Sequence, residues 1–124
     1  MTYYFAKVVD TPFQQTVERT IAALKDHGFG VLTRIDVQGT LKEKIGADFR
    51  PYVILGACNP RMAHQAEDKI GTMLPCNVIV QEVDGKTEVA AIDPVASMQA
   101  IQNEKLAAVA GKVSEELKAV VQSL

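Results

Sequence analysis

The chain has only two cysteines, almost no excess of charge and no long uncharged run. Two cysteines cannot form the disulfide framework of a small secreted domain, so we expect a hydrophobic core to supply the stability. A balance of 15 acidic against 13 basic side chains, with a net charge of −2, argues against a nucleic-acid-binding protein, which usually shows a strongly basic face. The longest uncharged runs, such as 70–81, have about a dozen residues, whereas a membrane helix needs about 20. We therefore predict neither a nucleic-acid nor a membrane partner.

Targeting and catalytic signals are missing as well. Residues 1–10 lack a positive start followed by an apolar stretch, so we expect no signal peptide and a cytoplasmic location. No composition shift, repeat or low-complexity tract divides residues 1–124, which predicts a single domain. No Ser-His-Asp constellation, glycine-rich phosphate loop or pair of carboxylates with acid–base spacing is visible. The sequence favours a binding role over an enzyme and nominates no cofactor.

Hydrophobic patterns of period two predict a sheet. We expect five strands, at roughly 3–9, 29–37, 52–55, 77–83 and 86–92. The second is expected to be half-buried, with one face formed by Phe29, Val31, Thr33, Ile35 and Val37. The third is apolar throughout and is therefore expected to be central, and Asp84-Gly85 is expected to join the last two as a hairpin.

Start and stop signals predict the helices between and after these strands. They run from Thr11-Pro12 to Gly28, over 41–45, from Asn59-Pro60 to about Lys69, and onward from Asp93-Pro94. Thr11 with Gln14, and Thr40 with Glu43, form possible capping boxes. The tail carries an apolar stripe at helical spacing: Leu106, Val109, Val113, Leu117, Val120 and Leu124. This order of elements predicts an α+β fold, an antiparallel sheet with its long helices packed on one face.

The candidates for chemistry concentrate in two Cys-Asn pairs, each beside a proline: Cys58-Asn59-Pro60 and Pro75-Cys76-Asn77. Cys58 directly precedes a predicted helix start, whose partial positive charge favours thiolate over thiol, so it is the better candidate for a reactive sulfur. Cys76 stands at the start of the next predicted strand. If the two strands are antiparallel, both cysteines lie at the same edge of the sheet, and the hairpin that follows favours this arrangement.

Three functional interpretations of this edge stand beside a purely structural one. The cysteines could form a redox dithiol, although their spacing is wider than in a Cys-x-x-Cys motif. They could bind a soft metal such as copper(I) or zinc, with His64, Met62 or Met73 as further ligands. The backbone amides of 59–62 could instead bind an anion at the helix start, assisted by Arg61. The structural alternative is that both thiols are simply buried.

Three other polar residues, Asp36, His64 and His27, are candidates whose structural role is the expected one. Asp36 could cap the loop before the short helix, and Arg34 on the same strand face is its expected salt-bridge partner; a role as a site acid is the alternative. His64 is a lone helical histidine, which is more typical of a surface or capping group than of a metal ligand. His27 lies near a helix C-terminus, where it can interact with the negative end of the dipole.

Residues 54–60 and 70–78 carry the sequences Ile-Leu-Gly-Ala-Cys-Asn-Pro and Ile-Gly-Thr-Met-Leu-Pro-Cys-Asn-Val. They resemble the signature of the domain-of-unknown-function-302 family, and further matches, such as Asp93-Pro94 followed by Met98, extend over essentially the whole chain. The resemblance implies a fold similar to the TATA-box-binding protein, with one strand, a helix, four strands and a final helix, plus a short extra helix after residue 59. It also implies a homodimer, but no activity or cofactor. The motif positions that carry over are Cys58, Asn59, Pro60, Pro75, Cys76 and Asn77.

The chain departs from the family pattern in two places. Arg34 stands where an acidic residue is usual, which weakens the case for a second acid beside Asp36. The helix after Pro60 is expected to be shorter by about one turn.

We therefore predict a homodimeric protein that binds a small ligand or anion at the two Cys-Asn motifs. The expected ligand-binding residues are Cys58, Asn59, Arg61, Cys76, Asn77 and Asp36. The candidates for a metal, should one bind, are Cys58, Cys76 and His64. Thiol redox or soft-metal binding is the first alternative, and a dimeric interaction module without a small ligand is the second.

Overall fold

The computed structural model describes residues 2–64 and 68–124. Within these residues the strands are β1 (Tyr4–Val9), β2 (Gly30–Asp36), β3 (Tyr52–Cys58), β4 (Cys76–Val83) and β5 (Lys86–Ile92). The helices are α1 (Phe13–Asp26), α2 (Val37–Ile45), α3 (Pro60–His64), α4 (Pro94–Ser97) and α5 (Glu104–Gln122), with a 3₁₀ helix, η1 (Asp68–Met73), before β4. No helix within the described ranges is long and apolar enough to cross a membrane.

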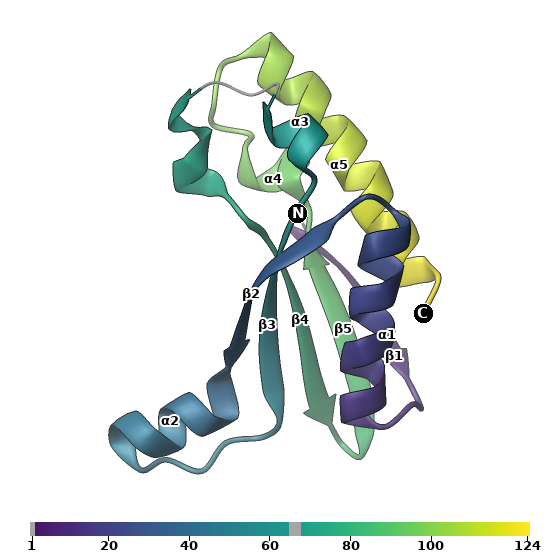
Figure 1. Cartoon of the computed structure of the whole chain (residues 1–124), viewed down its shortest axis with the longest axis vertical. Coiled ribbons are helices and arrows are strands. Elements are labelled where there is room, and N and C mark those ends of the chain that lie inside the picture. Colours follow the sequence, from purple (N-terminus) through teal and green to yellow (C-terminus); the bar gives the residue numbers. More distant parts are fainter. Residues whose placement is uncertain (1, 65–67) are drawn as a thin grey trace.

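The strands form one sheet in the order β1-β5-β4-β3-β2, and every neighbouring pair is antiparallel. The two long helices, α1 and α5, pack on the same face of this sheet (Figure 1). Their apolar stripes bury alternate strand residues in one core, which includes Leu24, Leu55, Val78, Val89 and Leu117. The predicted α+β fold, with its long helices on one face, is confirmed.

The short helices α3, α4 and η1 gather at the end of the sheet where β3 finishes and β4 begins, whereas α2 lies at the opposite end (Figure 1). Asp93 holds α4 in place, because its Oδ1 accepts hydrogen bonds from the Val95 backbone N–H at 3.0 Å and from Ser114 Oγ on α5 at 2.9 Å. The predicted helix start at Asp93-Pro94 is therefore confirmed, but the tail is interrupted after Ser97. Asn103 caps the long helix that follows.

Two predicted capping boxes are wrong. Thr11 does not cap α1, which has no side-chain cap; instead its carbonyl accepts from Thr16 Oγ1 at 3.1 Å and from Thr87 Oγ1 on β5 at 2.7 Å. The short helix α2 begins at Val37 rather than at 41, because Asp36 Oδ1 accepts a hydrogen bond from the Gly39 N–H at 3.1 Å and caps it.

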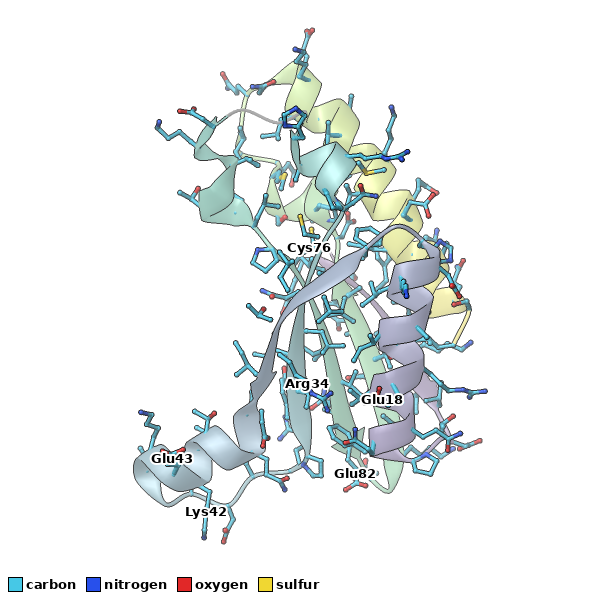
Figure 2. The ribbon with its side chains drawn as sticks, viewed as in Figure 1. Glu18, Arg34, Lys42, Glu43, Cys76 and Glu82 are labelled. Atoms are coloured by element: carbon cyan, nitrogen blue, oxygen red, sulfur yellow. The ribbon has the colours of Figure 1, made fainter. Side chains whose placement is uncertain are left out.

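The alternation predicted for 29–37 is disturbed by a register shift between Val31 and Thr33. The strand also lies at the edge of the sheet, so most of it is exposed rather than half-buried. The expected salt bridge between Arg34 and Asp36 is wrong. Arg34 Nη1 lies 3.6 Å from Glu18 Oε1 on α1, and the two side chains approach each other in Figure 2.

The helix predicted from Pro60 to about Lys69 is described only in part. α3 is described from Pro60 to His64, and Asp68 and Lys69 already belong to the 3₁₀ helix η1. Residues 65–67 lie outside the described residues. β3 is longer than predicted and continues to Cys58, which brings the end of the strand to the first Cys-Asn pair.

Candidate functional site

The two Cys-Asn motifs come together at one end of the sheet. Cys58 is the last residue of β3 and Cys76 is the first of β4, and Ala57 lies directly opposite Cys76 in the antiparallel register. Both cysteines are free thiols. Cys76 marks this end in Figure 2, whereas Glu82, later in the same strand, lies at the opposite end. The antiparallel arrangement that the sequence favoured therefore places both cysteines at the same edge.

A small cavity of about 30 Å³ lies beside the motifs, with room for roughly one or two water-sized groups. Four of its lining residues carry sulfur: Cys58, Met62, Cys76 and Met98. They come from the end of β3, from α3, from the start of β4 and from the residue that follows α4. The rest of the wall is almost entirely apolar, and much of it belongs to α5. We call this space the sulfur-lined cavity.

The environment of Cys76 favours its neutral form. Burial, and after it the charge of Cys58, raise the pKa of the Cys76 thiol from its ordinary value of 9.0 to about 11. Cys76 is 8% exposed, whereas Cys58 is half-buried. Cys76 is therefore protonated at neutral pH, and Cys58 is the more accessible of the two sulfurs.

The asparagines of the two motifs occupy different places. Asn59 Oδ1 accepts a hydrogen bond from the Met62 N–H at 3.3 Å, and the Asn59 carbonyl accepts from the Ala63 N–H at 2.9 Å. Asn59 thus caps α3 and lines the sulfur-lined cavity. Asn77 is exposed and lines a groove on the open face of the sheet, together with Tyr52. The two Cys-Asn pairs are therefore not equivalent.

Arg61 lies in an open groove beside α3, outside the cavity. The groove also contains Asp26, His27, Lys112 and Glu116. His27 caps the end of α1, and its Nδ1 lies 2.8 Å from Glu116 Oε2, so these two side chains already contact each other. With two carboxylates beside the cations, the groove offers an anion little net attraction.

Three further candidates lie away from the cavity. Asp36 pairs with Val53 in the register of β2 and β3, at the far end of the sheet from Cys58. His64 and Met73 are both exposed, and neither lines the cavity. The set Cys58, Cys76 and His64 is thus not assembled. Within the parts of the chain that the structure describes, no group of three or more His, Cys, Asp or Glu residues is placed to hold a metal ion.

The sequence patterns did not identify Met98 or the α5 wall as parts of the site. Met98 is distant from both motifs along the chain, and α4 places it there because Asp93 caps that helix and accepts a hydrogen bond from Ser114. The only signal was the position of Met98 after Asp93-Pro94 in the family resemblance.

These features define an α+β protein with an open antiparallel sheet and a sulfur-lined cavity at one end. A family model described as "Domain of unknown function DUF302" matches residues 5–124, and the chain belongs to this family. It is similar to a crystal structure of an uncharacterized conserved DUF302 protein from Bacillus stearothermophilus, with 31% sequence identity over 98% of each chain and a TM-score of 0.90. No curated protein matches.

Proposed function

We propose that this DUF302 protein binds a small, uncharged or soft ligand in the sulfur-lined cavity. The observation that supports the proposal is that two cysteines and two methionines from four separate segments line one space. An apolar cavity with a few convergent functional groups is typical of small-molecule sites. Thiols and thioethers are polarizable, so they favour polarizable partners over hard, strongly hydrated ones.

The geometry supports such a ligand better than the free anion that the sequence suggested. The Met62 N–H at the start of α3 is already bonded to Asn59. Arg61 lies outside the cavity. An anion inside would lose its hydration without gaining a cation, which is unfavourable in an apolar wall.

Native mass spectrometry of protein purified without chelator or added thiol tests the proposal. We expect a small non-covalent adduct that denaturation releases. In the variant Ala63→Leu, a larger side chain at this half-buried position of α3 fills part of the cavity, so we expect the adduct to disappear while circular dichroism stays unchanged.

Xenon provides a second measurement that needs no natural ligand, since it enters small apolar cavities. In protein with ¹³C-labelled methionine methyls, xenon should shift the Met62 and Met98 resonances but not that of exposed Met73. Inorganic phosphate should shift none of the three. The proposal fails if the wild type carries no adduct and xenon leaves Met62 and Met98 unmoved.

A dithiol redox role is the second candidate, supported by the placement of Cys58 and Cys76 on neighbouring strand ends. It predicts that mild oxidation joins the two sulfurs reversibly within one chain, which peptide mapping detects. We propose a cytoplasmic location for either role, because free thiols persist in that reducing compartment.

We also propose that the protein is a homodimer, as the family resemblance implies. The sheet face opposite α1 and α5 carries exposed apolar side chains, among them Tyr4, Val8 and Ile35, and such a face is costly to leave in water. Light scattering should give twice the chain mass of 13.5 kDa. Val8→Lys should reduce the measured mass to that of one chain without loss of fold. A wild-type mass of 13.5 kDa at high concentration contradicts the dimer, and with it the interaction module.

A further inference from the structure

Building on the proposed small-ligand site, we infer that the ligand is a soft monovalent metal ion of the copper(I) class, bound by the thiols of Cys58 and Cys76 and by one or both thioethers of Met62 and Met98.

The first argument is the kind of donor that the cavity offers. The chain has six sulfur-bearing residues, two cysteines and four methionines, and four of them line this one cavity of about 30 Å³. Thiolate and thioether ligands select copper(I) over harder ions. The sulfurs reach the cavity from four separate segments, so no local sequence repeat explains their convergence.

The second argument is the lack of donors that other metals require. Among residues 2–64 and 68–124, no Asp, Glu or His lines the cavity, which disfavours calcium and magnesium, since they take oxygen ligands. Zinc sites use thiolate, imidazole or carboxylate ligands, commonly four of them, and here only two side chains can supply charge. Exposed His64 does not line the cavity.

The third argument is charge. A buried ion is costly in an apolar wall unless its charge is neutralised. One cation of charge +1 with one thiolate forms a neutral unit, and neutral thioethers complete its coordination without adding charge. A divalent ion would need both thiolates for the same result.

Binding is a proton exchange without electron transfer. The copper(I) ion displaces the proton of one thiol, a sulfur–metal bond forms, the sulfur–hydrogen bond breaks, and the proton leaves to solvent. The other thiol stays protonated and coordinates as a neutral donor, so the complex carries no net charge. Because binding releases one proton, apparent affinity should rise with pH, by up to about tenfold per pH unit.

Anaerobic competition of the full chain with a chromophoric copper(I) chelator tests the inference. We expect one copper(I) per chain and sulfur-only scattering in X-ray absorption. Met62→Leu and Met98→Leu together keep the wall apolar and should weaken binding by roughly tenfold or more. Met73→Leu, in an exposed residue outside the cavity, is the matched control and should leave affinity unchanged.

Cys58→Ser and Cys76→Ser should each weaken binding further, and circular dichroism reports whether the buried Cys76 variant folds. Copper(I) affinity equal in the Met62/Met98 double variant and in Met73→Leu, or a nitrogen or oxygen shell in the absorption spectrum, overturns the metal assignment. If xenon still shifts the Met62 and Met98 methyls, only the metal assignment has failed; if xenon has no effect and no adduct is found, the proposed function has failed as well.

Discussion

Removing the thiol of Cys76 should change how the stability of the protein depends on alkaline pH. Cys76 lies at the start of β4 with 8% of its surface exposed, and its pKa is raised from 9.0 to about 11, by burial first and by the charge of Cys58 second. In the unfolded chain the same thiol ionises near its ordinary value. Between these two values unfolding releases a proton, so the free energy of unfolding falls as pH rises.

The size of the effect follows from the two pKa values. A difference of one in pKa corresponds to about 1.4 kcal/mol, so a rise from 9.0 to about 11 corresponds to roughly 3 kcal/mol at most. This stabilisation is fully present below pH 9 and is lost by about pH 11. For a domain of this size it is a sizeable fraction of the roughly 5–15 kcal/mol of total stability.

Urea unfolding under reductant, followed by circular dichroism at intervals from pH 8 to pH 11, measures the effect. Lysines and tyrosines also titrate in this window. We therefore compare the slope of the free energy of unfolding against pH in the wild type with the same slope in Cys76→Ala. We expect the wild type to lose up to about 3 kcal/mol more than this variant. Cys58→Ala is the second variant. Because burial is the larger cause, it should keep most of the wild-type slope.

Equal losses in the wild type and in Cys76→Ala between pH 8 and pH 11 would refute this reasoning, because they would show that the thiol has the same pKa in the folded and unfolded protein. If the free energy of unfolding of Cys58→Ala changed as little with pH as that of Cys76→Ala, the order of the two causes would be the reverse. In that case the charge of Cys58, rather than burial, would dominate.

Three further predictions concern stability and are measured by urea unfolding at neutral pH. Gly56→Ala should destabilise the protein by about 1–3 kcal/mol, because the new methyl group would overlap Thr33 Oγ1 and lie 2.7 Å from Pro75 Cγ; a neutral result would mean that β2 can move away. Gly111→Ala, in α5, should instead stabilise by about 0.5–1 kcal/mol, because the added Cβ would meet no atom of another element within 4 Å; a loss would contradict an open position there. Asn103→Ala should cost about 1 kcal/mol, since the Asn103 Oδ1 accepts a hydrogen bond at 3.1 Å from the Leu106 N–H in the first turn of α5. An unchanged unfolding midpoint would show that the cap contributes nothing.

Local patterns predicted the strands and long helices well, because periodicity and turn chemistry act over a few residues. The Asp84-Gly85 hairpin is an example, with φ of 51° and 76° in the conformation that such turns require. Two predicted helix starts were wrong: α1 has no side-chain cap at Thr11, and Asp36 caps α2 from Val37. The Thr11 carbonyl is held by Thr87 of β5, a contact that no local pattern contains.

The candidate site was predictable only in part. The two cysteines could be placed at one edge because antiparallel neighbours bring the end of one strand to the start of the next. Whether a third group joins them depends on how the smaller helices dock. Asp36 and His64 lie elsewhere, and Met98 takes a place at the cavity.

The scarcity of cysteine was the first feature of this sequence, and it correctly pointed to a core rather than to a disulfide framework for stability. By itself the sequence determined the family, the α+β fold and the two motifs, since these depend on residues close together in the chain. Only the tertiary structure decided that two methionines join the two cysteines around one apolar cavity. Strand register and the docking of α4 on α5 bring these sulfurs together, and both arise from contacts between residues far apart in sequence.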